Sequence, residues 1–427
     1  MTTATSRAAT TAPATDSTGT RTSRAVSAVS DSTAAGITAP IRPRSPRGPP
    51  PQRAAGAEPA HDLHTPAGPA AATRGGASRT CGPCPRTSAW DPQDARRSAV
   101  PTSRNPRVCV LAPTPILTVT LENGSDDATP EIHVHPGGQG LWVARMAYSL
   151  GADVVVCGPF GGEVGTVLGH LAEVENLRVR RVSYAGGNGA YLHDRRGGER
   201  AELAFMPPAR LDRHELDDLY GTVLVEALDA DVCVVTGAYP TPLLPPSFFG
   251  RLVGDLRAAG VRTVADLSGK AAVAAAEAGA DVLKMSHEEL VEAGLAVDDS
   301  VASLRAGARR LLREAPAPPD GHDADGVPAG QVGAMLVSRA AEPALLVTPE
   351  GVAEIVPPSV TTVDHRGAGD SMTAGTAVGV GRGLRLTEAA RLGAAAGALN
   401  VTRRGLGTGH REQIERFAEQ ITVREID

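Results

Sequence analysis

The stretch VTTVDHRGAGDSMTAG, residues 360–375, joins the end of a β-branched run to the start of a helical one. The β-branched residues end at Val363, and the small residues after Asp370 predict a helix whose first turn begins in the glycine motif. The free backbone N–H groups of such a turn carry the positive end of the helix dipole and bind anions such as phosphate. Glycine leaves the approach to them open, so the stretch predicts an anion-binding strand-to-helix turn.

Asp370 closes this glycine motif and is expected beside the anion site. A carboxylate there repels phosphate, but it is useful if it accepts the proton of a hydroxyl that attacks a phosphoryl group. We therefore predict that Asp370 is a catalytic base. A simpler alternative stays open at this point, in which Asp370 only caps a helix and the glycines only form a turn.

A second glycine cluster, HPGGQGLWVARMAYSLGA at residues 135–152, also precedes an amphipathic helix. The sequence contains no GxxxxGK[ST] loop and no GxGxxG motif at a strand-to-helix turn. P-loop and Rossmann dinucleotide sites therefore lose their main support. The later turn is the better candidate for phosphate binding.

From residue 107 onward, short apolar runs alternate with alanine-rich helical segments, which is typical of a mainly parallel sheet covered by helices. Strands are predicted at VCVL (108), ILTVTL (116), DVVVC (153), DVCVVTG (231), VRTVADL (261), DVLKM (281) and AMLVS (334), and late helices at 369–380, 387–401 and 410–421. Residues 178–206 alternate polar and apolar side chains between glycine turns, which predicts a small β lid. Residues 315–330, rich in Pro, Gly and Asp, predict an exposed loop.

Residues 1–105 differ from the rest of the chain, because Ala, Thr, Ser, Pro, Gly and Arg dominate them without a sustained apolar period. Such a segment buries too little surface to offset its ordering entropy, so we predict disorder there. It carries a net charge of +7, and with the whole chain at -6 the remaining residues carry about -13. An acidic body argues against a nucleic-acid partner, and without a spanning apolar run or a signal-peptide pattern we expect no membrane partner and a cytoplasmic location.

The two glycine motifs together resemble the two signatures of the ribokinase-like carbohydrate kinases, the PfkB family, and most closely its 1-phosphofructokinase and tagatose-6-phosphate kinase branch. Further segments that resemble this branch are PILTVTLENGSDD, GPFGG, TGAYPTPLLPPSFFGRLV, LKMSHEELVEAG and GALNVTRRGLGTG. The resemblance covers residues 108 to about 420, and residues 106–427 are taken as one kinase domain. It implies a three-layer α/β/α sandwich with a mainly parallel sheet and a small β lid, whose strands fall within about 116–135 and 178–206.

The resemblance also implies an activity, namely transfer of the γ-phosphate of ATP, with Mg²⁺ present, to a hydroxyl of a sugar or a sugar phosphate. By match to the GAGD motif, Asp370 is the base, and the backbone of Gly367, Ala368 and Gly369 forms the anion hole. Lids in this family can become dimer interfaces, so a homodimer through the lid is the assembly to consider.

Other positions are assigned by the same match. Asp126 aligns with the substrate-binding aspartate of the opening strand, and Gly137, Gly138 and Gln139 stand in the glycine motif that the sugar approaches. Glu289 matches the glutamate of the NxxE element, which helps to organise Mg²⁺ and the phosphates. Ser338 begins the segment that corresponds to the loop near the nucleotide.

Four positions and one loop depart from the family pattern. Gln139 replaces the lysine of GGKGxN and Trp142 replaces its asparagine, while Ser286 replaces the asparagine of NxxE and His365 a threonine of DTxGAGD. The nucleotide loop reads SRAAEPA from Ser338. A neutral amide at 139 cannot supply a point charge for a sugar phosphate, which argues against an acceptor that already carries phosphate. These departures keep a second hypothesis open, a catalytically impaired protein that binds a sugar or nucleotide as a regulatory module.

Overall fold

The computed structural model describes residues 105–124, 129–198, 200–237, 243–313, 333–403, 405 and 407–426. The chain divides into two compact units, Met1–Pro85 and Arg86–Asp427, and all the described residues belong to the second. The predicted disorder before Asn105, the predicted loop at 315–330 and the candidate Asp126 lie outside the described residues.

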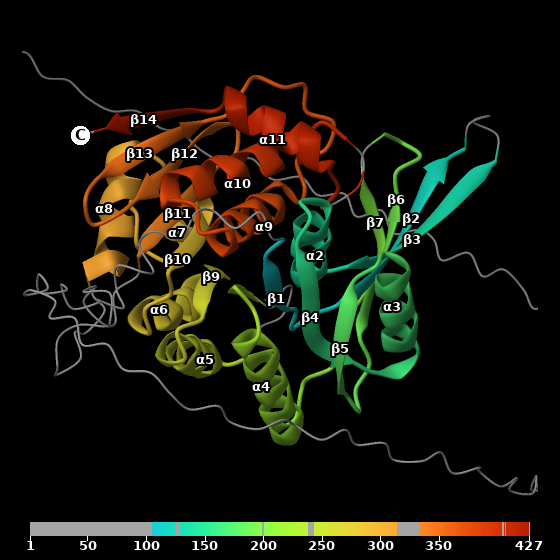
Figure 1. Ribbon diagram of the computed structural model, residues 1–427. Coiled ribbons are helices and arrows are strands. Elements are labelled where there is room, and N and C mark those ends of the chain that lie inside the picture. Colours follow the sequence, from blue (N-terminus) through green and yellow to red (C-terminus); the bar gives the residue numbers. More distant parts are fainter. Residues whose placement is uncertain are drawn as a thin grey trace, which may run out of the picture. The chain divides into compact units, whose positions relative to one another are not determined.

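A large sheet forms the centre of the second unit, in the order β14-β13-β12-β11-β10-β9-β8-β1-β4-β5 (Figure 1). The strands from β11 to β5 pair in parallel, whereas β12, β13 and β14 extend the sheet in antiparallel fashion. Their bounds are β1 Arg107–Leu111, β4 Asp153–Phe160, β5 Arg178–Ser183, β8 Val232–Thr236, β9 Arg262–Asp266, β10 Val282–Ser286, β11 Ala334–Arg339, β12 Glu342–Val347, β13 Val352–Val356 and β14 Thr422–Ile426. Because helices cover both faces, the parallel strands are almost continuously apolar.

Two buried clusters lie on opposite faces of the sheet, since neighbouring strand residues point to opposite sides. One face packs against α4 Arg213–Leu228, α5 Pro246–Ala258, α6 Gly269–Glu277, α7 His287–Glu292 and α8 Val301–Arg313. The other packs against α2 Gln139–Ser149, α3 Gly162–Val174, α9 Ala368–Gly381, α10 Leu386–Asn400 and α11 Arg411–Gln420. The predicted three-layer α/β/α sandwich is confirmed. None of the helices in the described ranges has the length and apolar character that spanning a membrane requires.

A second, four-stranded sheet stands apart from the large one, in the order β3-β2-β6-β7. Its strands are β2 Ile116–Asn123, β3 Pro130–Gly137, β6 Gly189–Asp194 and β7 Ala201–Met206. The two outer pairings are antiparallel, and β2 and β6 run parallel. This sheet, hereafter the lid, projects beside α2 and α3 in Figure 1.

One part of the segment predicted as lid belongs elsewhere. Residues 178–183 form β5, which pairs in parallel with β4 at the edge of the large sheet. Its exposed arginines produced the polar and apolar alternation, because an edge strand needs only one buried face. The alternation therefore correctly indicated half-burial but not which sheet the strand joins.

The glycines of α9 and α10 allow these two helices to pack closely against each other. A Cβ atom at Gly393 would lie 2.2 Å from the hydroxyl of Thr376, and one at Gly375 would lie 2.7 Å from the carbonyl of Leu392. Only glycine fits at such separations. This contact fixes α9, and with it the glycine motif at its start, against the core.

Candidate active site

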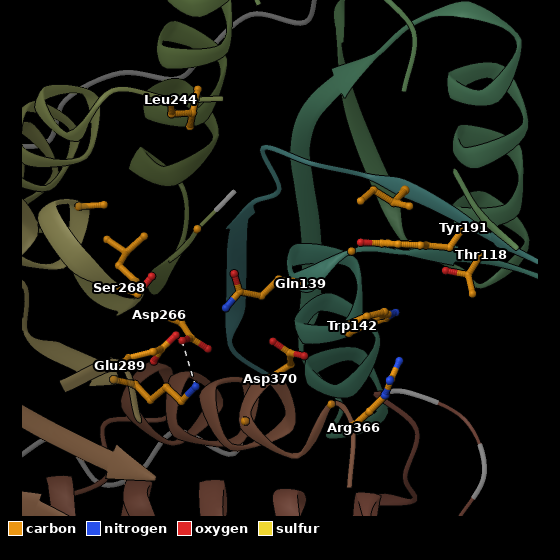
Figure 2. A pocket seen from close by; sticks show the side chains of 18 of the residues that line it. Thr118, Gln139, Trp142, Tyr191, Leu244, Asp266, Ser268, Glu289, Arg366 and Asp370 are labelled. Atoms are coloured by element: carbon orange, nitrogen blue, oxygen red, sulfur yellow. Dashed lines mark hydrogen bonds and ion pairs between the residues drawn. The ribbon is translucent and has the colours of Figure 1, made fainter. Parts of the chain in front are cut away.

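A cavity of about 870 Å³ lies between the lid and the carboxyl ends of the parallel strands. Gly237 after β8, Asp266 at the end of β9 and Lys284 in β10 line it from the large sheet, and Thr118 and Tyr191 line it from the lid. Ligands of open parallel α/β sheets bind at this end of the strands. Figure 2 shows Asp266 on one side of Asp370, and Thr118 and Tyr191 on the other, toward the lid.

The predicted anion-binding turn opens into this cavity. Gly367 is the N-cap of α9 with a φ of 72°, a left-handed conformation that favours glycine. A Cβ atom at Gly369 would lie 2.9 Å from the Nζ atom of Lys284, so glycine is required there as well. Gly367, Gly369 and Asp370 line the cavity, and Ala368 contributes the first helical residue of the turn.

The carboxyl of Asp370 is half-buried at the floor of the cavity. Burial and the nearby carboxylates of Asp266 and Glu289 together raise its pKa to about 7, against the opposing effects of Lys284 and Gln139. A carboxyl group with this pKa can exchange a proton near neutral pH. The environment of Asp370 thus differs from that of a simple helix cap, and the N-cap position of α9 is Gly367 rather than Asp370.

Lys284 neutralises the acidic end of the cavity. Its Nζ atom lies 3.1 Å from Oδ1 of Asp266, and the Thr373 hydroxyl donates to Oδ2 of Asp266 at 2.6 Å. Burial lowers the pKa of Lys284, but the surrounding carboxylates outweigh burial and raise it overall. Lys284 is therefore a protonated cation held between the carboxylates and the glycine turn.

Glu289 and Ser286 form a capping box at the start of α7. The Ser286 backbone N–H donates to Oε2 of Glu289 at 2.7 Å, and the Glu289 N–H donates to the Ser286 hydroxyl at 3.1 Å. Serine therefore performs the capping that the family's asparagine would provide. Glu289 lines the cavity, whereas Ser338, paired with Ser286 across β10 and β11, does not.

The glycines at 137 and 138 are required by packing within the protein itself. A Cβ atom at Gly138 would lie 2.3 Å from the Thr114 carbonyl oxygen, and its φ of 98° is left-handed. At Gly137 a Cβ atom would lie 2.5 Å from the Thr118 hydroxyl. The backbone of the second glycine cluster thus packs against the connection from β1 to the lid, and Gly138 lines the cavity next to Gln139.

Trp142 lines the cavity on the lid side and is one turn from Gln139 on α2. In Figure 2 its ring lies near Thr118 and Arg366, on the opposite side of Asp370 from Glu289. Trp142, which replaces the asparagine of the family motif, therefore has access to the cavity. His365, by contrast, is exposed and does not line the cavity.

Six charged cavity residues were not identified as site residues from the sequence: Arg200, Glu202, Asp266, Lys270, Lys284 and Arg366. Lys284 carried a detectable signal, since a lysine inside an apolar strand requires a buried partner. Asp266 carried a weaker one, as an acid at the carboxyl end of a buried strand. The two arginines carried none, because the sequence contains 40 arginines among its 42 basic residues.

The arrangement defines a class of protein, a small-molecule kinase, because a near-neutral carboxyl lies beside free helix N–H groups under a lid. Comparison with known proteins gives the particular family. Residues 109–413 match the profile of the pfkB family carbohydrate kinases, and the chain belongs to that family. The protein is therefore a carbohydrate kinase, as the sequence motifs predicted.

Relatives with known names agree. The chain is 29% identical over 309 residues to the ATP-dependent 6-phosphofructokinase isozyme 2 of Escherichia coli, covering 68% of this chain and 93% of the relative. It is 27% identical over 287 residues to the 1-phosphofructokinase of Bacillus subtilis, covering 67% and 86%. Among solved structures, phosphofructokinase-2 from Escherichia coli, in complex with potassium, aligns with a TM-score of 0.62 at 24% identity, covering 74% and 98%. A possible 1-phosphofructokinase from Thermotoga maritima aligns with a TM-score of 0.61 at 19% identity, covering 75% and 100%.

Proposed function

We propose that this kinase transfers the γ-phosphate of ATP to a hydroxyl of a sugar phosphate or sugar. The observation that carries the proposal is Asp370, whose raised pKa and position at the start of α9 suit a base beside an anion hole. The relatives of this chain that are named 6-phosphofructokinase and 1-phosphofructokinase support a hexose derivative as the acceptor.

In the proposed reaction Asp370 accepts the proton of the attacking hydroxyl. The backbone N–H groups of Gly367, Ala368 and Gly369 hold the transferring phosphoryl group, whose negative charge they stabilise without reorganisation. Gln139 lines the cavity with Asp370 and lowers the pKa of its carboxyl. Most of the rate enhancement then comes from positioning and electrostatics, as is usual for phosphoryl transfer.

The donor set of the cavity fits Mg²⁺ bound largely through phosphates and water. Within the described residues no group of three or more His, Cys, Asp or Glu side chains could hold a metal alone, and Mg²⁺ commonly keeps water and phosphate ligands with one or two carboxylates. Glu289 uses Oε2 in its capping box, which leaves Oε1 to hold the ion or its water. Bound there, Mg²⁺ would neutralise phosphate charge. We also propose Ser338, with Glu289, as a contact for the nucleotide.

The pH dependence of turnover tests this proposal. With ATP, Mg²⁺ and a panel of hexoses, hexose phosphates and nucleosides, we expect ADP release with at least one acceptor. For that acceptor kcat/KM should rise about tenfold per pH unit below 7 and level off above it, because the base acts only when deprotonated.

Circular dichroism at each pH controls for unfolding, and a buffer pair overlapping at pH 7 controls for buffer effects. No turnover with any member of the panel, or a kcat/KM that stays constant from pH 8 to pH 5.5 in folded protein, would contradict Asp370 as the base.

We further propose a homodimer formed through the lid. The lid face that carries Thr118, Tyr191 and His193 faces the cavity, whereas exposed apolar side chains lie on the two edge strands: Ile132 is 66% exposed on β3 and Leu203 52% on β7. Exposed apolar surface of this kind is typical of interaction sites. One relative's structure is described as a tetrameric inhibited form, which shows that such a kinase can associate.

Sedimentation velocity tests the dimer. Ile132→Asp should convert a wild-type dimer to a monomer, because a desolvated carboxylate is costly in an interface. The matched control is Val225→Asp, a change at a similarly exposed position on α4, which should leave the dimer intact. A monomeric wild type, or a dimer that survives Ile132→Asp, would refute the interface.

We also propose that the kinase acts in the cytoplasm, where ATP is supplied. The three cysteines in the described part of the chain are buried and free, which suits a reducing compartment. Cell fractionation with an antibody against the protein would contradict this if the protein were found outside the cytoplasm.

A further inference from the structure

Two arginines approach the lid end of the cavity from different parts of the chain. Arg200 lies directly before β7 in the lid, and Arg366 directly precedes Gly367 at the start of α9. Both line the cavity. Figure 2 shows Arg366 on the side of Asp370 that faces Trp142 and Thr118, away from Glu289.

Within the described part of the chain neither arginine side chain forms an ion pair, and the Nε atom of Arg200 is buried without a hydrogen-bond partner, whereas the Arg366 side chain is exposed. The Asp364 carboxylate accepts a hydrogen bond from the Arg366 backbone N–H at 3.1 Å and acts electrostatically on Arg200, but its ion pair is with Arg195. Glu202 also lines the cavity but pairs with neither of them. A buried guanidinium donor that is left unpaired costs free energy, so a site of this kind is better satisfied with a ligand present.

A neighbouring arginine shows the contrast. Arg195, in the same lid hairpin, donates to Oδ2 of Asp364 at 3.0 Å and lies 3.7 Å from Oε1 of Glu122. It thereby connects the lid to the loop before α9 and is electrically balanced within the protein. Arg200 and Arg366 form no such ion pair within the described residues, although both line the lid end of the cavity.

The state of the surrounding groups agrees with a concentration of positive charge. Burial, together with the charges of Arg200, Arg366 and Arg195, lowers the pKa of His193 to about 4. Burial lowers the pKa of Arg200 to about 10, with Arg366 and Arg195 contributing in the same direction. The Nδ1 atom of His193 is also buried without a partner. Arg200 and His193, each with a buried nitrogen that has no hydrogen-bond partner, thus line the cavity together with the Arg366 guanidinium.

We propose that Arg200, Arg366 and His193 form the binding site for a phosphate group that the acceptor already carries. This inference deepens the proposed function and rests on it: the acceptor's hydroxyl lies at Asp370 while its phosphate lies at the lid end. Two guanidinium groups suit a phosphate dianion, whose oxygens accept several charge-assisted hydrogen bonds. The charge that Gln139 cannot supply comes instead from β7 and from the loop before α9, so the sequence-based argument against a phosphorylated acceptor does not hold.

Direct binding without ATP tests the site independently of catalysis. Isothermal titration calorimetry would compare fructose 1-phosphate, fructose 6-phosphate, fructose and inorganic phosphate on the full chain. The variants are Arg200→Gln and Arg366→Gln, and the matched control is Arg196→Gln, an exposed arginine of the same hairpin that bonds to Asp194. We expect each test variant to weaken binding of a sugar phosphate roughly tenfold to a hundredfold, and the control to leave it unchanged.

The other arms identify the source of the anion. Fructose should bind weakly and equally to all variants, and inorganic phosphate should bind weakly but with the same dependence on Arg200 and Arg366. Wild-type protein that binds no sugar phosphate, or binds one equally in the test variants, overturns the inference. So does a loss of ATP affinity in the variants with sugar-phosphate affinity intact, because the arginines would then serve the nucleotide.

This design separates the inference from the proposed function. If sugar phosphate binds through the arginines but no ADP is released, the kinase proposal fails while the anion site stands. If ADP is released with an unphosphorylated acceptor and binding of sugar phosphates is insensitive to both arginines, the kinase proposal stands and the anion site fails.

Discussion

Asp370→Asn is expected to lower kcat by roughly a hundredfold to ten-thousandfold, the usual contribution of a positioned general base. Asparagine has nearly the shape of aspartate but cannot accept the proton, so the fold and the affinity for ATP should persist. Steady-state kinetics with the best acceptor of the panel would measure the loss, and kcat should no longer rise with pH through 7.

The same substitution is expected to stabilise the protein above neutral pH. Because the folded-state pKa of Asp370 is raised from 3.8 to about 7, the stability associated with its protonated form is present below 3.8 and lost as the pH rises through 7. The Asp370→Asn variant has no such loss. Its free energy of unfolding should therefore exceed that of the wild type at pH 8, while at pH 4 the two proteins should be about equally stable. A variant with full activity, or with lower stability at pH 8, would be incompatible with a strained catalytic carboxylate at this position.

Lys284→Met is expected to have the largest effect on stability. It removes the buried cation that pairs with Asp266 and leaves the carboxylates of Asp266, Glu289 and Asp370 close together. Breaking one side of a buried ion pair costs about 3–5 kcal/mol. Urea denaturation at pH 7.5 would measure the loss. Since the pKa of Lys284 is raised in the folded state, its contribution is fully present at this pH and would be lost only as the pH rises through that raised pKa.

Two comparisons sharpen this prediction. Lys270→Met makes the same change at the other lysine, which is exposed on α6, and should alter the free energy of unfolding by less than about 0.5 kcal/mol. Adding Asp266→Asn to Lys284→Met should recover part of the lost stability, because it removes the unpaired carboxylate. Any activity that remains in Lys284→Met should need a higher pH, since Lys284 lowers the pKa of Asp370. Equal effects at the two lysines would show that the buried pair is not important.

The local sequence was enough to predict the late helices and the glycine turn that forms one part of the site. The predicted helices at 369–380, 387–401 and 410–421 correspond within two residues to α9, α10 and α11. Glycines before a helix and a carboxylate at its first turn carry their chemistry in four consecutive residues, so the GAGD turn could be interpreted without the fold.

The positions of Lys284 and Arg200 in the site could not be predicted, because they depend on which distant residues the two sheets bring together. Lys284 reaches the glycine turn 85 positions later only because β10 lies beside β9 in the large sheet. Arg200 reaches the same cavity because β7 pairs with β6 in the lid, whereas 178–183, with a similar alternating pattern, joins the large sheet as β5.

The sequence by itself therefore determined most of the parallel strands and the late helices in their order, the glycine turn at the start of α9 and the family. Only the tertiary structure decided the partner of Lys284, the pairing of the lid strands and the convergence of Arg200 with Arg366. The physical reason is that helical and strand periodicity reports which face of an element is buried, while sheet order and register, set by the whole core, decide what that face meets.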